Sequence, residues 1–142
     1  MATHKASAMW TGTLKEGKGA MNLPNSECDH PFNACSRFET GEGSNPEEMI
    51  GAAHAGCFSM ALSHALAEAG HDPKRIDTKA AVELETSGGS PKITSIKLTT
   101  EGEVPGMEAD EFNKFAENAR DNCTVSKALE GVNISVDATL KS

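Results

Sequence analysis

A long segment of small and apolar residues between positions 46 and 69 constrains the fold of this chain more than any other feature. Asn45 and Pro46 are a typical N-cap and first helical residue, and Glu48 stands where a capping box places a carboxylate. Gly70 is the residue expected just after the last turn. The predicted helix has about 24 residues and a length of roughly 36 Å. Because it is built mostly of Ala, Gly, Ser, Met, His and Leu, we expect it to be buried nearly all round, with a partner subunit helping to cover it.

Alternating apolar residues predict strands on both sides of this helix, arranged as two hairpins and one closing strand. An amphipathic helix and a short helix are expected before the closing strand. Because the hairpins occur without a repeating strand–helix–strand unit, the predicted fold class is antiparallel α+β. The predicted strands are 6–14, 18–23, 76–86, 96–100 and 132–140, and the two further helices are 112–119 and 123–129.

Residues 24–45 show no regular pattern between the first hairpin and the long helix. Connections of this length are uncommon unless they are functional or disordered. Phe32 and Phe38 give the segment apolar anchors, and Arg37 is its only arginine. We interpret the segment as an active-site loop.

The length and composition of the chain exclude several classes of function. Its 142 residues are one domain's worth, so a single domain over 1–142 is predicted. A formal net charge of −8 and a pI near 5.1 argue against nucleic acid as a partner. The N-terminus lacks the apolar run of a signal peptide, and no stretch has the roughly 18 consecutive apolar residues of a membrane span. We therefore expect a cytoplasmic protein that does not bind membranes.

Two cysteines in helical settings, Cys57 and Cys123, suggest a redox-active thiol pair. One sulfur of such a pair accepts an oxygen atom and then closes a disulfide with the other, which requires no metal or organic cofactor. Since a free thiol has a pKa of about 8.5, a reactive one needs a nearby cation, and Arg37 is the best candidate. On pattern alone, Cys57 is well explained as a packed core residue, and Cys123, at a predicted helix start, is the more reactive thiol.

Two other hypotheses use the same region of the chain. His54, Cys57 and His64 are ligand types that suit zinc or copper, which suggests a metal-binding module. However, His64 lies roughly 10 Å along the helix axis from Cys57, too far for a shared ion, so ordinary packed or partly exposed histidines explain both positions better. The remaining alternative is a redox sensor that reacts once with peroxide.

Several motifs along nearly the whole chain are specific enough to suggest a family. The longest is NPEEMIGAAHAGCFSMAL at residues 45–62, around Cys57. Shorter ones are Met9-Trp10-Thr11-Gly12, Arg37-Phe38-Glu39, Ile76-Asp77-Thr78, Val104-Pro105-Gly106 and Cys123-Thr124-Val125-Ser126. Together they resemble the OsmC branch of the OsmC/Ohr hydroperoxide peroxidases.

This resemblance implies antiparallel sheets wrapped around a long central helix in an intertwined homodimer. It also implies a thiol-dependent peroxidase that prefers organic hydroperoxides to hydrogen peroxide and acts in defence against oxidative and osmotic stress. Cys57 matches the peroxidatic cysteine, Cys123 the resolving cysteine, Arg37 the thiolate-stabilising arginine and Glu47 the carboxylate that orients it. The resemblance thus reverses the pattern-based ranking of the two thiols. An external dithiol, such as a lipoylated protein or a small dithiol, is expected to reset the disulfide.

Helix geometry separates Glu47 from Cys57. Ten residues correspond to roughly 15 Å on a straight helix, and the two positions lie on different faces. We therefore predict a composite site, in which Glu47 of one subunit serves Arg37 and Cys57 of the other.

Residues near Cys57 on the long helix are candidates for a substrate pocket. Met49, His54 and Phe58 are predicted to line an apolar pocket that suits an alkyl hydroperoxide, with core packing as the alternative. Cys28 and Cys35 are not part of the family motif. They are interpreted as incidental loop thiols, with a secondary resolving pair as the alternative.

Overall fold

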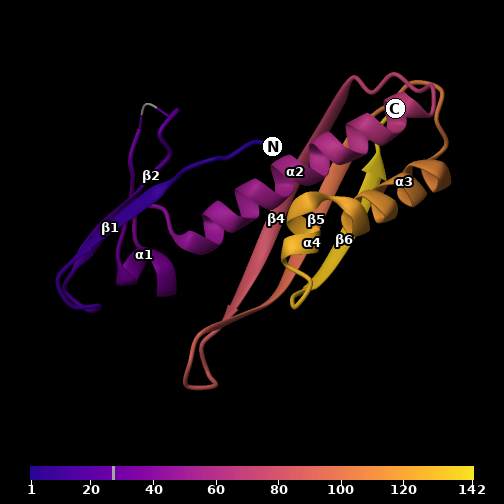
Figure 1. The fold of residues 1–142 in the computed structure, drawn as a ribbon. Coiled ribbons are helices and arrows are strands. Elements are labelled where there is room, and N and C mark those ends of the chain that lie inside the picture. The colour runs from indigo at the N-terminus through magenta and orange to yellow at the C-terminus, as the bar shows by residue number, and fades with distance from the viewer. Residues whose placement is uncertain (27) are drawn as a thin grey trace. The chain divides into compact units, whose positions relative to one another are not determined.

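The computed structural model describes residues 1–26 and 28–142, which form two compact units, residues 1–49 and 50–142 (Figure 1). The first unit is built on a three-stranded antiparallel sheet in the order β1-β2-β3. Gly19 on the central strand is the register neighbour of Trp10 and Phe32 on the flanking strands. Because Gly19 has no side chain, the two rings meet over it with their centroids 5.4 Å apart. The strands are β1 (Ser7–Thr11), β2 (Lys18–Asn22) and β3 (His30–Phe32).

The prediction that residues 24–45 form an irregular loop is wrong for the middle of this segment. This segment contains β3 and a short helix, α1 (Ala34–Phe38). Pro31 has no amide hydrogen, and β3 tolerates it because this strand lies at the edge of the sheet. α1 begins with a reciprocal cap, in which Asn33 Oδ1 accepts from the Ser36 amide at 2.8 Å and Ser36 Oγ accepts from the Asn33 amide at 2.9 Å.

The predicted long helix is confirmed as α2 (Pro46–Glu68). Asn45 Oδ1 accepts the Glu48 amide at 2.7 Å, as expected of an N-cap. At the other end, Gly70 has a positive φ of 91°, and the His71 amide donates to the Leu66 carbonyl at 3.0 Å. Both ends of α2 therefore follow from local sequence signals.

The second unit contains a three-stranded sheet in the order β4-β5-β6 (Figure 1). The predicted hairpin of β4 (Arg75–Glu85) and β5 (Lys92–Glu103) is confirmed as an antiparallel pair. β6 (Asn133–Leu140), in contrast, runs parallel to β5, so the prediction of purely antiparallel sheets needs correction. The connection from β5 to β6 passes through two helices, and a crossover of that length is what allows parallel pairing. These helices are α3 (Ala109–Asn122) and α4 (Thr124–Ala128).

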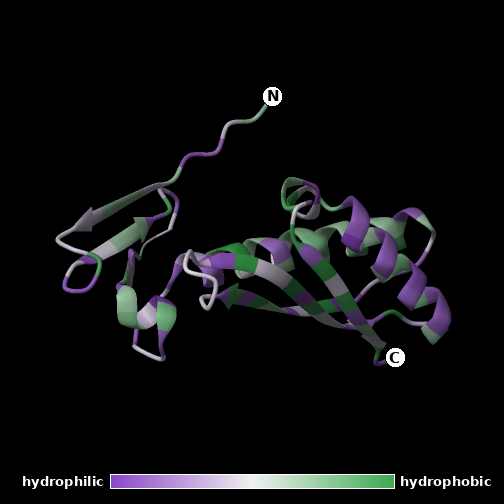
Figure 2. Ribbon diagram, turned by 90° about the horizontal axis from the view of Figure 1, so that it is seen from below, coloured by the Kyte–Doolittle hydropathy of each residue, from purple (hydrophilic) through white to green (hydrophobic). Residues whose placement is uncertain are grey.

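Apolar residues of α2, the sheet and α3 form one hydrophobic core in the second unit. The alternation of hydropathy along its strands and helices is visible in Figure 2. A Cβ at Gly51 of α2 would lie 3.2 Å from Val82 of β4, so this glycine allows the helix to approach the strand closely. The largest fully buried apolar side chains of the core are Phe58, Leu62, Leu66, Ile96, Leu98, Val104 and Phe112.

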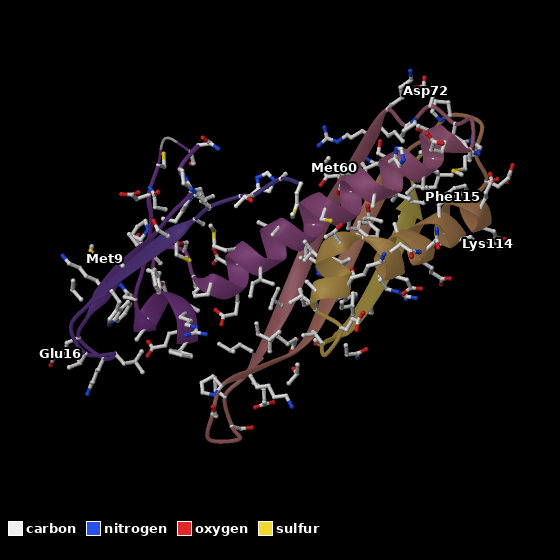
Figure 3. The ribbon with its side chains drawn as sticks, viewed as in Figure 1. Met9, Glu16, Met60, Asp72, Lys114 and Phe115 are labelled. Atoms are coloured by element: carbon white, nitrogen blue, oxygen red, sulfur yellow. The ribbon has the colours of Figure 1, made fainter. Side chains whose placement is uncertain are left out.

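One side of α2 is exposed in the single chain. Ala52, Ala53 and Gly56 lie on it, followed by Met60, whose relative exposure is 76% (Figure 3). These four positions carry small or apolar residues, which are suited to close packing against another surface. Among the described residues, no helix combines the length and the apolar character needed to cross a membrane.

Candidate functional site

Arg37 and Glu47 form an ion pair within the first unit of the same chain. Arg37 Nη2 and Nε donate to Glu47 Oε1 at 2.8 and 3.0 Å, and Nε lies 3.2 Å from Oε2. The Glu47 side chain is 8% exposed, whereas that of Arg37 is 35% exposed. A nearly buried carboxylate thus fixes a guanidinium that solvent can still reach. The part of the composite-site prediction that pairs Glu47 with Arg37 of the other subunit is therefore wrong.

Asn45 explains why these two side chains meet. Its Nδ2 donates to the Ser36 carbonyl at 2.9 Å, while its Oδ1 caps α2 through the Glu48 amide. Asn45 therefore joins α1, whose last turn carries Arg37, to the first turn of α2, which carries Glu47.

An apolar groove of about 320 Å³ lies beside the guanidinium in the first unit. Arg37 lines it, and the Arg37 guanidinium carbon lies 5.2 Å from the centre of the Phe38 ring. The other lining residues are Trp10, Leu14, Phe32, Asn33, Ala34 and Phe38.

The three residues predicted to line a substrate pocket occupy other positions. His54 and Phe58 are fully buried in the second unit. Met49 is half-buried at the end of the first unit. None of the three lines the groove beside Arg37.

Cys123 belongs to the hydrophobic core of the second unit, and Cys57 packs against that core. Cys57 lies on α2 and is half-buried. Cys123 lies between α3 and α4 and is 2% exposed. All four cysteines are free thiols, and Cys28 and Cys35 are exposed in the first unit.

Cys123 takes part in a buried set of hydrogen bonds that sequence analysis did not reveal. Its Sγ accepts the Ser126 amide at 3.3 Å and lies 3.1 Å from Ser126 Oγ. Ser126 Oγ in turn lies 2.7 Å from Nε2 of His54 on α2. Burial lowers the pKa of His54 below its ordinary value, so the ring is neutral near pH 7. The only local sign of Ser126 is its position three residues after the cysteine that caps α4.

The arrangement of the histidines does not favour a metal centre. His54 Nε2 is engaged by Ser126, and His64 is exposed. Within residues 1–26 and 28–142, no three His, Cys, Asp or Glu side chains are grouped so that they could hold a metal ion.

Comparison with known proteins assigns the chain to a family. The family model for OsmC-like protein matches residues 39–137. Peroxiredoxin OsmC of Escherichia coli is 44% identical over 144 aligned positions that cover all of both chains. The organic hydroperoxide resistance protein of Xanthomonas axonopodis pv. citri is 31% identical over 105 positions, 70% of this chain and 68% of that protein.

The fold points the same way. The crystal structure of an OsmC-like protein from Mycoplasma pneumoniae superposes with a TM-score of 0.74 at 17% identity, covering 98% of this chain and 97% of the other. These matches confirm the resemblance noted in the sequence, and the chain belongs to the OsmC family.

Proposed function

We propose that this protein is a thiol-dependent peroxidase that reduces organic hydroperoxides to alcohols. The Cys57 thiolate attacks the distal peroxide oxygen, the O–O bond breaks, and the alkoxide leaves as an alcohol after taking a proton. The Cys57 sulfenic acid then condenses with Cys123, which forms a disulfide and releases water. Two relatives, a peroxiredoxin and an organic hydroperoxide resistance protein, support this activity by name.

The contrast in exposure between two thiols on one hydrophobic core is the observation that carries the proposal. A peroxidatic thiol must be reached by substrate, and Cys57 is half-buried. A resolving thiol must be kept from reacting first, and Cys123 is 2% exposed. This contrast supports Cys57 as the peroxidatic residue, although a pattern-based argument ranks Cys123 higher.

The Arg37–Glu47 pair is suited to stabilise the thiolate. Glu47 occupies Nε and one edge of the guanidinium, so the other edge can face an anion. Because Glu47 and Cys57 are ten positions apart on α2, we infer that the Arg37–Glu47 pair of one protomer serves Cys57 of its partner. This revises the predicted composite site, because Arg37 and Glu47 now both come from the same protomer.

The groove beside Arg37 supports a preference for organic hydroperoxides. Its aromatic and aliphatic side chains can bury an alkyl or aryl group, whereas hydrogen peroxide gains nothing from them. Burial of each methylene group is worth about 0.8 kcal/mol.

A partner subunit and a reductant complete the proposal. The exposed side of α2 supports a homodimer. A dithiol, such as a lipoylated protein or a small dithiol, is needed to reduce the Cys57–Cys123 disulfide, and we infer a cytoplasmic location because thiols are kept reduced there.

A peroxidase assay with tert-butyl hydroperoxide, hydrogen peroxide and excess dithiol tests the proposal. We expect many turnovers for the parent and none for Cys57→Ser. With one equivalent of peroxide and no dithiol, Cys123→Ser should be oxidised once at Cys57 without an intramolecular disulfide. Cys28→Ser/Cys35→Ser is the matched control and should keep full turnover. A parent that stops after one equivalent of peroxide is a sensor, and this outcome would overturn the assignment as an enzyme.

A further inference from the structure

A buried line of hydrogen bonds joins the two helical regions that carry the thiols. It runs from Cys123 Sγ to Ser126 Oγ at 3.1 Å and from Ser126 Oγ to His54 Nε2 at 2.7 Å. The three residues are 2%, 5% and 0% exposed. His54 and Ser126 are 72 positions apart in sequence, so the fold itself creates this contact.

The direction of these hydrogen bonds depends on which nitrogen of the His54 ring carries the proton. The Ser126 amide donates to Cys123 Sγ, and the thiol donates its own proton to Ser126 Oγ. The hydroxyl has one proton, and His54 Nε2, at 2.7 Å, is the acceptor toward which it can be directed. In the His54 tautomer with an unprotonated Nε2, the thiol, the hydroxyl and the imidazole are therefore arranged donor to acceptor in one sequence.

His54 also lies close to the other thiol. It precedes Cys57 by three positions on α2, and residues at this spacing are neighbours on a helix surface, with roughly 5 to 6 Å between their Cβ atoms. The imidazole is thus hydrogen-bonded to the neighbour of Cys123 and belongs to the same stretch of α2 as Cys57.

We propose that Ser126 and His54 form a proton relay for the resolving step, in which Cys123 attacks the sulfenic acid of Cys57. The proposal rests on the roles given above to the two thiols. Cys123 passes its proton to Ser126 Oγ as Ser126 passes its own to His54 Nε2, which leaves a Cys123 thiolate and a His54 imidazolium. The S–S bond then forms, the S–O bond of Cys57 breaks, and the leaving hydroxide becomes water with the proton that His54 Nε2 returns through Ser126 Oγ.

The surroundings of His54 support transient rather than permanent protonation. Burial lowers the pKa of His54, so the ring begins as a neutral base. Its Nδ1 is buried without a hydrogen-bond partner among the described residues. An imidazolium in this position lacks stabilisation and readily returns its proton. Ser126 contacts the reacting sulfur, whereas His54 acts through Ser126.

Single-turnover experiments with one equivalent of tert-butyl hydroperoxide separate the two chemical steps. Loss of peroxide reports attack by Cys57, and mass spectrometry after acid quenching reports the disulfide. In Ser126→Ala we expect an unchanged first step and disulfide formation slowed by about 100-fold, the usual scale for loss of general base catalysis. Ser126→Thr keeps the hydroxyl and should restore most of the rate.

His54→Gln and Ser59→Ala complete the design. Gln can still hydrogen-bond to Ser126 but cannot take a proton, so it should slow the second step as Ser126→Ala does. Ser59→Ala removes a hydroxyl of α2 that bonds to Thr78 at 2.7 Å instead, and both steps should proceed as in the parent. Disulfide formation at the parent rate in His54→Gln, or equal slowing of both steps, would overturn the relay. Failure of the first step in the parent would instead refute the proposed function.

Because Ser126 is buried, its Ala variant can fail to fold, so a measurement on the unaltered protein is needed as well. Nitrogen-15 NMR of the reduced protein reports which imidazole nitrogen of His54 carries the proton. The relay requires an unprotonated Nε2 that accepts from Ser126, and a protonated Nε2 would exclude it.

Discussion

Four of the six buried polar residues in the described part of the chain show where it departs from a purely apolar interior. Glu47, His54, Thr100 and Ser126 are each 6% exposed or less, and each has a hydrogen-bonding partner. A buried polar group without such a partner costs about 1–3 kcal/mol, so these residues restrict which partners the chain can place beside them. Thr100 joins Thr78 and Ser59 within the second unit. The other three belong to the ion pair and the relay.

Replacing Arg37 by lysine tests whether geometry or charge alone is required. Lysine keeps the positive charge but cannot contact Glu47 through two nitrogens at once, so it leaves the cation poorly oriented. We expect kcat/KM for tert-butyl hydroperoxide to fall by about tenfold or more, equivalent to at least about 1.4 kcal/mol of transition-state free energy. Arg75→Lys is the matched control, since Arg75 pairs with Asp77 at 2.9 Å on an exposed surface. An Arg37→Lys variant as active as the parent would show that charge suffices.

The lowered pKa of His54 predicts a dependence of stability on pH. In the unfolded chain this histidine takes up a proton as pH falls through about 6.5, whereas in the folded protein it does so only at lower pH. The unfolded state then binds more protons, so the free energy of unfolding falls by up to about 1.4 kcal/mol per pH unit in that window. Urea unfolding at pH 7.5 and 5.5 measures this loss, and His54→Gln should show a smaller one. An equal loss in both proteins would contradict the assignment to His54.

At the scale of elements, the sequence predicts best the helices and strands whose ends are marked by capping or turn residues. α2 is recovered almost to the residue, because Asn45 caps its start and Gly70 adopts the left-handed conformation that ends it. The β4–β5 hairpin follows from alternation, since exposed and half-buried residues alternate along β4.

Elements that are defined by contacts with residues far away in the sequence are not predicted from the sequence pattern. β3 is three residues long with Pro31 at its centre, and only its pairing with β2 makes it a strand. The alternation in β6 gives its inward face but not its direction, which is set by the crossover through α3 and α4. The Arg37–Glu47 pair and the Ser126–His54 contact are also tertiary, so no local pattern indicates them.

The packing of α3 on β5 depends on the absence of a side chain at Gly102. A Cβ there would overlap the ring of Phe112, which is fully buried and has no room to withdraw. We expect Gly102→Ala to lower the free energy of unfolding by about 1–3 kcal/mol, the usual cost of overpacking. Gly88→Ala is the matched control, because nothing lies within 4 Å of its added Cβ. Partial recovery of stability in Gly102→Ala/Phe112→Leu would identify the ring as the cause, and an unchanged Tm in Gly102→Ala would contradict it.

At the scale of the whole molecule, the exposed side of α2 and the proposed composite site both require a partner subunit. A helix side made of Ala52, Ala53, Gly56 and Met60 gains stability when another surface removes it from water. If the Arg37–Glu47 pair serves the partner's Cys57, catalysis is lost whenever that surface is uncovered.

Gly56→Glu tests in one variant whether this side of α2 is covered in a dimer and whether peroxidase turnover requires that dimer. The Cβ of residue 56 points into open space in the single chain, so the substitution leaves the fold of the protomer intact. In a dimer that covers this side of α2, the new carboxylate loses its hydration, at a cost of the order of several kcal/mol. Light scattering should therefore show a shift from twice 14.9 kDa to 14.9 kDa, with peroxidase turnover falling in proportion. Asn113→Glu, on the exposed side of α3, should remain dimeric and active. A monomeric Gly56→Glu with full turnover would show that each chain carries a complete site, and the composite site would then be wrong.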